Sequence, residues 1–258
     1  QNQPKSHKFP VRKCIVSRFP GGQILEADYS GLEFRVCGMI SNDKQILQDV
    51  KNGKDIHTQT AMIINQIDAD KVTKELRFQA KAHSFAPLFG SQASGQEDHV
   101  RKYYTEFFTI YSGVKKWHDS LVTSVLKEGI IRTPSGREFK WDNPRRLGNG
   151  RVSQHTQVVN YPVQSFSCAD LVVLACIRAY KLFRKLKMQS KLILTVHDSI
   201  VVDCHPNEIE DVKKVISFAM MGLNDDTKKR WNYELSIPLD IEMSLGKNWM
   251  ELNEINLA

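Results

Sequence analysis

Residues 191–204 read KLILTVHDSIVVDC, two β-rich runs that flank the polar triplet His197-Asp198-Ser199. The leucines and valines on both sides of the triplet predict two buried strands joined as a hairpin, with the polar residues at its tip. An acidic residue at such a tip is most often a simple turn residue. Asp198 alone therefore does not indicate a metal site.

A second carboxylate ends another expected strand, nearer the start of the chain. The stretch QILEADYS, residues 23–30, follows the Gly21-Gly22 turn and predicts a strand that ends at Asp28. Taken alone, Asp28 is better explained as an N-cap for the residues that follow it. Mg²⁺ binds few carboxylates together with waters and phosphates, so a pair of strand-end aspartates would nevertheless be sufficient for a metal site.

Helical patterns fill most of the chain between these strands. They are expected at about 41–67, 70–88, 96–108 and 113–127, followed by a loop or small hairpin at 133–150. A long helix from about 163, the hairpin, a helix at about 207–221 and a strand at about 237–245 complete the pattern. Strands at both ends and helices between them predict an α+β fold, a sheet interrupted by a helical insertion.

The helix expected to begin at an Asp70 N-cap and to run to about Leu88 combines charge and aromaticity on one face. Four of its residues recur at every fourth position: Arg77, Lys81, Phe85 and Phe89. The rise from the first to the third of them is about 12 Å, a length on which a triphosphate could lie. Solvated cations and core phenylalanines cannot share one stripe, so the pattern favours a helix that faces a cleft.

Composition limits the class of protein. The chain has 258 residues, a formal net charge of +7 and a pI near 9.1, which suits an anionic partner such as nucleic acid but also a merely basic surface. Its five cysteines include no CxxC pair and read as reduced thiols. No apolar run approaches about 20 residues, and the polar N-terminal stretch is not a secretory signal.

Together these segments resemble motifs A, B and C of the family A DNA polymerases, the bacterial DNA polymerase I type. The family's motif A, DYSxxELR, corresponds to DYSGLEFR at 28–35, and motif C, usually His-Asp-Glu, corresponds to 197–199. Motif B corresponds to the stripe above, followed by Gly90. The stretches DIHTQTA at 55–61 and NYPVQ at 160–164 match two further segments in the expected order. The resemblance spans almost the whole chain, and some departures look similar to viral members.

The resemblance implies a metal-dependent nucleotidyl transfer from a deoxynucleotide to a primer 3′-hydroxyl. Asp28 and Asp198 would hold two Mg²⁺ ions, for which Mn²⁺ is a possible substitute, and the Tyr29 carbonyl would be a further ligand. The triphosphate would be held by three residues: Arg77, Lys81 and His57. Lys81 would also be the proton donor to the departing pyrophosphate.

The resemblance also implies how the sugar, the base and the DNA are recognised. Phe85 would stack on the incoming base, with Tyr29 and Phe89 nearby, and Glu33 would cover the sugar 2′ position. Gln164 and His197 would contact the minor groove near the primer end, where a contact checks pair shape and not sequence. Asn160 would belong to the same DNA-binding surface, whereas Arg35 is better explained as structural.

Two residues depart from the family pattern. Phe89 stands where the family usually has Tyr, so no hydroxyl is present there to bond Glu33, and a looser sugar gate is expected. Ser199 stands where motif C usually has Glu, which removes a negative charge beside the metals. His-Asp-Ser is the pattern of single-subunit RNA polymerases, which remain an alternative, although Glu33 and Phe85 argue against it.

By the same resemblance, the palm would comprise residues 1–40 and 153–258 and the fingers 41–152. The thumb, the Thr-Gly-Arg segment and the exonuclease domain of such enzymes are not found in this sequence. The chain is thus expected to be a piece of a split polymerase, a processed fragment or an expressed portion, with the thumb supplied by another polypeptide. A non-catalytic nucleic-acid-binding remnant is the third alternative. The expected partners are primer–template DNA and dNTPs, with no membrane, in bacterial or virus-infected host cytoplasm or an organelle.

Overall fold

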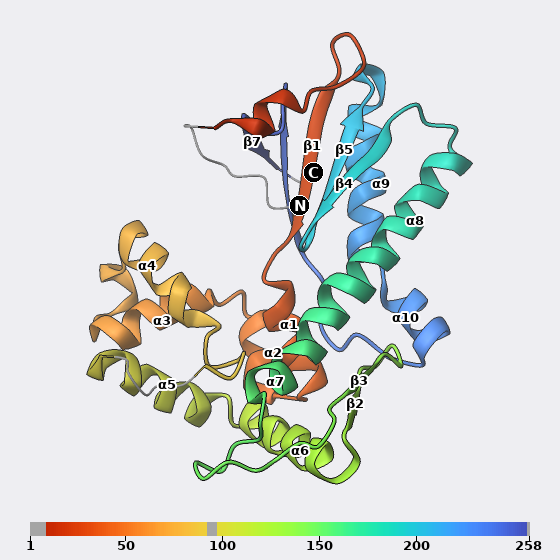
Figure 1. Ribbon diagram of the computed structural model, residues 1–258. Helices are drawn as coiled ribbons and strands as arrows, with labels where there is room; N and C mark the ends of the chain where they lie inside the picture. The colour runs from red at the N-terminus through yellow and green to blue at the C-terminus, as the bar shows by residue number, and fades with distance from the viewer. Residues whose placement is uncertain (1–8, 92–96, 257–258) are drawn as a thin grey trace. The chain divides into compact units, whose positions relative to one another are not determined.

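The computed structural model of the chain describes residues 9–91 and 97–256. The chain divides into two compact units (Figure 1). We call them the sheet unit, Gln1–Leu32 with Ser167–Ala258, and the helical unit, Glu33–Phe166. The division lies at 32/33 and 166/167, whereas the sequence led us to expect domain boundaries at 40/41 and 152/153. Among the described residues, no helix combines the length and the apolar character needed to cross a membrane.

The sheet unit is built on five antiparallel strands in the order β4-β5-β1-β6-β7. Their bounds are Gln23–Tyr29 for β1, Lys191–Val196 for β4, Ser199–Cys204 for β5, Ile241–Gly246 for β6 and Leu252–Ile255 for β7. Its helices are η1 (Val11–Cys14), α8 (Val172–Lys185), η4 (Pro206–Glu208), α9 (Ile209–Met221) and α10 (Asn224–Trp231). An antiparallel sheet with helices confirms the predicted α+β class.

Helices α8 and α9 pack against one face of this sheet (Figure 1). The Tyr29 hydroxyl reaches this layer and donates a hydrogen bond to the Met220 carbonyl at 2.7 Å. Since side chains alternate along a strand, Glu26 and Asp28 project to the opposite face. The distal part of that face is covered by a small core of Ile24, Val201 and Trp249, which leaves the Asp28 end open to solvent.

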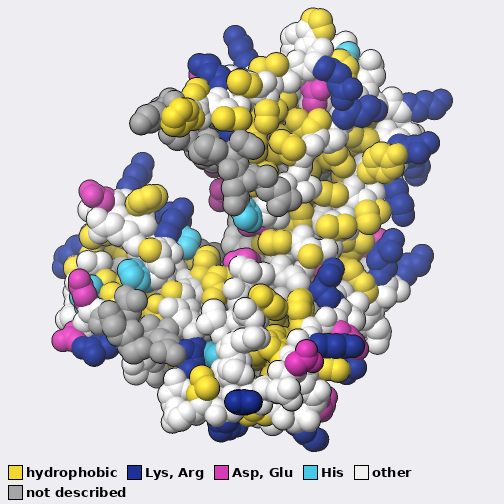
Figure 2. All heavy atoms as spheres, viewed as in Figure 1, with side chains coloured by type: hydrophobic (Ala, Val, Ile, Leu, Met, Phe, Trp, Pro, Cys, Tyr) yellow, Lys and Arg dark blue, Asp and Glu magenta, His cyan; other side chains and the backbone are white. Residues whose placement is uncertain are grey.

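Helix α8 presents apolar side chains to solvent. Val173, Ile177 and Tyr180 are exposed on it, and Figure 2 shows hydrophobic side chains gathered over this part of the sheet unit. Lysines and arginines surround them in the same view.

The helical unit consists of helices and one short hairpin. The helices are α1 (Leu32–Ile40), α2 (Lys44–Lys51), α3 (Ile56–Asn65), η2 (Ala69–Lys71), α4 (Lys74–Ser84), α5 (Asp98–Ile110), α6 (Ser112–Glu128) and α7 (His155–Gln164). The hairpin strands are β2 (Ile130–Arg132) and β3 (Glu138–Lys140). A π-helical stretch, η3 (Ser165–Leu171), continues α7 into α8.

A buried carboxylate joins two of these helices. Asp43 is 2% exposed, and one of its oxygens accepts from the Ile46 amide at 2.9 Å, as the N-cap of α2. Its other oxygen accepts from the Val114 amide at 3.1 Å, in the first turn of α6. Asp43 therefore satisfies otherwise unpaired amides at two helix starts.

The structure corrects the expected bounds of the helix at 70–88. Asp70 lies in η2 and is not the N-cap, because the helix begins after Thr73, whose hydroxyl accepts from the Leu76 amide at 3.2 Å. The helix ends at Ser84, ahead of Pro87, because proline lacks an amide proton and disfavours helical geometry in the residue before it. Phe85 and Phe89 thus follow the helix in a turn, and the stripe does not continue as one helical face.

Other elements also differ from the sequence prediction. The pattern at 41–67 is two helices, because Gly53 takes a left-handed conformation with φ +65° and Asp55 caps a new helix. Helices α1 and α10 and strand β7 were not predicted, and α7 begins at His155, ahead of the helix start expected near 163. The hairpin at 191–204 was predicted correctly.

Candidate active site

Two aspartates lie side by side at one end of the central strands of the sheet unit. Strands β1 and β5 pair with Asp28 opposite Ser199, and Asp198 precedes Ser199 in a two-residue turn that closes on Val196. His197 takes the positive φ of 54° at the first position of that turn, which suits a tight hairpin. The Tyr29 amide donates to the Asp198 carbonyl at 3.3 Å, and the carboxyl group of Asp28 lies close to that of Asp198.

The electrostatics of this end of the sheet favour a cation. Burial of the carboxyl group and the negative charges of Asp198, Glu26 and Glu242 raise the pKa of Asp28 to about 7. The Asp28 side chain nevertheless remains open to solvent. Part of the rise in the Asp28 pKa comes from repulsion by the neighbouring carboxylates. A bound cation would offset this repulsion and lower the pKa again.

The donor set at Asp28 and Asp198 fits Mg²⁺. This ion takes one or two carboxylates and completes its shell with waters and substrate phosphates, so two aspartates with an open side suit it. Among the residues that the structure describes, no group of three or more His, Cys, Asp or Glu side chains could form a closed metal cage. Tyr29 offers only its backbone here, because its side chain is buried against α9.

In the helical unit, one carboxylate organises the residues expected to hold a triphosphate. Asp55 caps α3 by accepting from the amides of His57 and Thr58 at 3.2 Å each. It also receives two hydrogen bonds from Arg77, from Nε at 2.6 Å and from Nη2 at 3.1 Å. Burial alone would raise the pKa of Asp55, but these bonds outweigh it and hold the pKa at about 2. Arg77 keeps its other N–H groups for further contacts.

The tautomer of His57 follows from its neighbour. Its Nδ1 lies 2.9 Å from the Ser84 hydroxyl, and that hydroxyl donates its proton to the Ala80 carbonyl at 2.9 Å. Nδ1 is therefore the donor to Ser84, and Nε2 of the neutral ring is an acceptor. Burial lowers the pKa of His57, and the charges of Arg77 and Lys81 lower it further against the opposing effect of Asp55.

Aromatic rings meet next to this ionic cluster. The Phe85 ring lies 5.3 Å from His57, 5.9 Å from Phe34 and 6.4 Å from Phe89. Gly90 follows with φ +74°, and a Cβ on it would lie 2.6 Å from Val159. Glycine is thus required at this position, and the turn after α4 is held close to α7.

The remaining predicted residues are spread over α4, α1, α7 and the β4–β5 turn. Lys81 is exposed on α4, Glu33 lies in the first turn of α1, and His197 is exposed at the hairpin tip. Asn160 and Gln164 occupy positions i and i+4 of α7, and Gln164 is exposed. The Asn160 Oδ1 atom is buried and finds no hydrogen-bond partner among the described residues.

Two contributors were missed from the sequence, Asp55 as the partner of Arg77 and Glu26 as a carboxylate beside Asp28. The Asp55 cap has a local signal, an aspartate ahead of a helical pattern, but its ion pair with a residue in another helix has none. Glu26 carries the alternation signal that places it on the face of Asp28.

Comparison with known proteins decides the family. The sequence matches the family described as DNA polymerase family A over residues 1–251. The chain belongs to family A. It is 32% identical to DNA polymerase I of Lactococcus lactis subsp. cremoris over 96% of this chain and 29% of that protein. It is 30% identical to DNA polymerase I of Caldicellulosiruptor bescii over 93% of this chain and 28% of that protein.

A solved structure has the same fold. It is the polymerase domain of Pol1 from M. smegmatis, in complex with a DNA primer-template and a dNTP. The two chains superpose with a TM-score of 0.80 at 22% identity, over 96% of this chain and 44% of that one. The chain described here spans less than a third of the length of the curated family A relatives it matches.

Replacing Asp28 with Asn is expected to remove a pH dependence of stability. The raised pKa means that the fold holds the Asp28 proton more tightly than the unfolded chain does. This contribution favours folding below about pH 4, the ordinary carboxyl range, and is lost as the pH rises through about 7. When unfolding by urea is measured without divalent cations, the free energy of unfolding of the parent should therefore fall more between pH 4 and pH 8 than that of Asp28→Asn.

The matched control is Asp211→Asn, the same change at an exposed position of α9, which should keep the parental slope. Added Mg²⁺ should recover stability at pH 8 in the parent and in the control, but not in Asp28→Asn. Parallel pH curves for the parent and Asp28→Asn would contradict the assignment of the raised pKa.

Proposed function

We propose that this chain carries the catalytic centre of a DNA-directed DNA polymerase. In the reaction, the primer 3′-oxygen attacks the α-phosphorus of a dNTP and loses its proton, and the bond from that phosphorus to the bridging oxygen breaks to release pyrophosphate. The observation that carries the proposal is the pair Asp28 and Asp198, one at the end of β1 and the other in the turn before β5, with a raised Asp28 pKa. Such a pair has little structural purpose without a cation.

Asp28, Asp198 and the Tyr29 carbonyl would hold two Mg²⁺ ions, or Mn²⁺ in their place. When bound, these ions make the 3′-hydroxyl a better nucleophile and neutralise charge on the phosphates. The contribution of the protein is to hold the metal-binding groups in place. The β1–β5 register and the Tyr29 amide bond to the Asp198 carbonyl hold the backbones of the two aspartates close together before any ligand arrives.

Arg77, Lys81 and His57 would bind the triphosphate. Asp55 orients the guanidinium of Arg77, and its remaining N–H groups can reach phosphate oxygens. Neutral His57 presents an acceptor at Nε2, so it would bind phosphate only after it gains a proton there, which an approaching anion favours. Lys81 would give a proton to the pyrophosphate and stabilise the charge that grows on it in the transition state.

The other predicted residues would select the nucleotide and hold the DNA. Phe85, supported by the rings of Phe34 and Phe89, would stack on the incoming base. Glu33 would exclude a ribose 2′-hydroxyl. Three residues would contact the primer–template near its end: Gln164, His197 and Asn160.

The proposed partners are primer–template DNA and dNTPs, which also suit the basic composition. The solved relative is a complex with these two ligands. We further propose that the duplex is held with the help of a thumb-bearing portion of the polymerase, and that the reaction takes place inside cells. The fingers would rotate to bring Arg77 and Lys81 onto the nucleotide.

Primer extension with dNTPs or rNTPs tests the proposal directly. The chain is assayed alone and with a thumb-bearing fragment of a DNA polymerase I, in Mg²⁺. We expect extension with dNTPs, and a loss of about 1,000-fold in Asp198→Asn, because several kcal/mol of charge stabilisation is removed. Asp211→Asn is the control and should extend normally.

Other outcomes separate the alternatives. Preference for rNTPs would indicate the single-subunit RNA polymerase, which Ser199 favours. DNA binding without extension under any of these conditions would indicate a non-catalytic module. Extension that survives Asp198→Asn would contradict the metal assignment.

Phe89→Tyr is expected to tighten the exclusion of ribonucleotides. The resemblance to family A implies that a tyrosine hydroxyl at this position would hydrogen-bond Glu33. One such bond is worth about 1 kcal/mol, so the dNTP/rNTP selectivity ratio should rise about fivefold. The matched control is Phe78→Tyr, which adds the same hydroxyl at an exposed position of α4. Single-nucleotide incorporation kinetics measure the ratio, and an unchanged ratio in Phe89→Tyr would refute the looser gate.

A further inference from the structure

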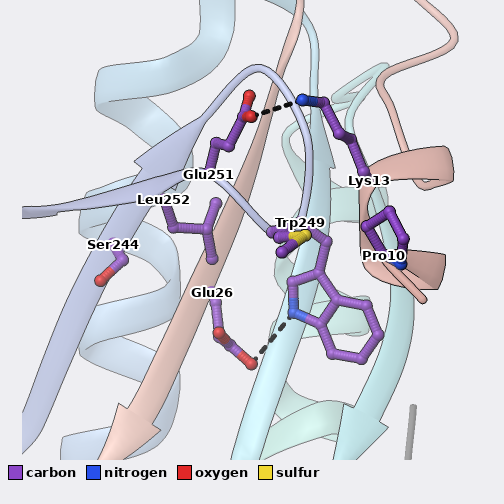
Figure 3. Close-up of a pocket in the computed structure, with 8 residues that line it drawn as sticks. Pro10, Lys13, Glu26, Ser244, Trp249, Glu251 and Leu252 are labelled. Carbon is purple, nitrogen blue, oxygen red and sulfur yellow. Dashed lines mark hydrogen bonds and ion pairs between the residues drawn. The ribbon is translucent and has the colours of Figure 1, made fainter. Parts of the chain in front are cut away.

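Glu26 joins the aspartate turn to a buried tryptophan. It lies on β1 two residues before Asp28, so both side chains project from the same face of the sheet. Its Oε1 atom accepts two hydrogen bonds, from the Ser199 hydroxyl at 3.3 Å and from Trp249 Nε1 at 3.1 Å. Figure 3 shows the indole nitrogen of Trp249 directed at this carboxylate, at the wall of a pocket of about 500 Å³.

Ser199 connects this carboxylate to the turn that carries Asp198. It is the residue after Asp198, it is 4% exposed, and it pairs with Asp28 on one side and Val196 on the other. Its hydroxyl proton is shared between two acceptors, the Val196 carbonyl at 3.1 Å and Glu26 Oε1 at 3.3 Å. The shared proton links the strand residue before the turn to β1, next to the strand position of Asp28.

The tryptophan holds the other side of the carboxylate still. Trp249 is 2% exposed and packs with Ile24 and Val201, and the Arg12 guanidinium lies 4.1 Å from its ring centre. Its amide donates to the Ile15 carbonyl at 3.0 Å. Because the Trp249 indole is fixed in this way, its hydrogen bond restricts the rotamer of Glu26. The Glu26 carboxylate in turn restricts the position of the Ser199 hydroxyl that bonds it.

We propose that Glu26 is a positioning residue that holds Asp198 against Asp28, and that it takes over from β1 the carboxylate that motif C usually carries at position 199. Family A motif C usually reads His-Asp-Glu, and here serine stands in place of that glutamate. The acid is present on the neighbouring strand, bonded to that serine. This inference rests on the proposed function of Asp28 and Asp198, and concerns how they are held.

Metal affinity tests the inference without any need for catalysis. The full chain is titrated with Mn²⁺, and free Mn²⁺ is followed by electron paramagnetic resonance. Glu26→Ala is expected to weaken binding about 10-fold, the usual loss when a partner that orients metal ligands is removed. Glu26→Gln keeps an acceptor for both donors and should lose less. Glu254→Ala is the matched control, since Glu254 follows Glu26 and Ser244 in the same cross-strand row but lies on the edge strand β7.

A double-mutant cycle tests whether Glu26 acts through Ser199. Ser199→Ala alone should weaken Mn²⁺ binding in the same direction, and Glu26→Ala/Ser199→Ala should be no weaker than Glu26→Ala, because both remove one linkage. Effects that multiply independently, or Mn²⁺ binding in Glu26→Ala equal to the parent, would overturn the proposal. Circular dichroism reports folding, and if Glu26→Ala unfolds, the cycle is run with Glu26→Leu, which keeps side-chain volume but cannot accept from Ser199.

Moving the carboxylate from position 26 to position 199 of motif C tests the proposal most sharply. Glu26→Ser/Ser199→Glu exchanges the two side chains across the strand pair. The Mn²⁺ affinity of this double variant should lie within about threefold of that of the parent. The affinities of the two single variants, Glu26→Ser and Ser199→Glu, should differ from the parent by more than that. In primer extension, the single variants should lose kcat with dNTP KM little changed, and the exchange should recover it. If the parent extends no primer, the proposed function fails, and the Mn²⁺ affinities still decide the role of Glu26. An exchange no better than Glu26→Ser alone would contradict the relocation.

Discussion

The pairing of β1 with β5 forces two carboxylates together, and the function proposed for this chain depends on that constraint. The register of these strands places Asp28 opposite Ser199. Because Asp198 comes directly before Ser199 in a two-residue turn, it must lie near Asp28. Burial and three neighbouring carboxylates raise the pKa of Asp28 to about 7, so the arrangement costs stability at neutral pH unless a cation is bound. A bound divalent cation would convert this repulsion into attraction, which is why we propose a metal site here.

Further carboxylates fix the groups around the expected substrates. Asp55 caps α3 and holds the guanidinium of Arg77, so one side chain couples the starting turn of a helix to a residue that we propose binds phosphate. Glu26 is held by Trp249 and bonds Ser199 beside the aspartate turn. In both units, the residues proposed to do chemistry are positioned by acids that do not themselves belong to the reaction, which is how preorganisation is usually achieved.

The sequence predicted those features that depend on local patterns. The hairpin at 191–204 and the strand ending near Asp28 follow from apolar runs between turn residues, and the α+β class follows from their order. The N-cap at Asp70 was wrong because Thr73 competes for the same helix start, and the end at Leu88 was wrong because of Pro87. The contacts of Asp55 with Arg77 and of Glu26 with Ser199 join distant segments, so no local pattern indicates them.

Anomalous X-ray diffraction from crystals of the chain grown with Mn²⁺, primer–template DNA and a non-hydrolysable dNTP analogue tests most directly whether Asp28 and Asp198 bind the metal. We expect anomalous density between the Asp28 and Asp198 carboxylates, with the Tyr29 carbonyl as a further ligand. This density should disappear in Asp198→Asn crystals. Density elsewhere on the chain, with none at these two aspartates, would contradict the metal assignment.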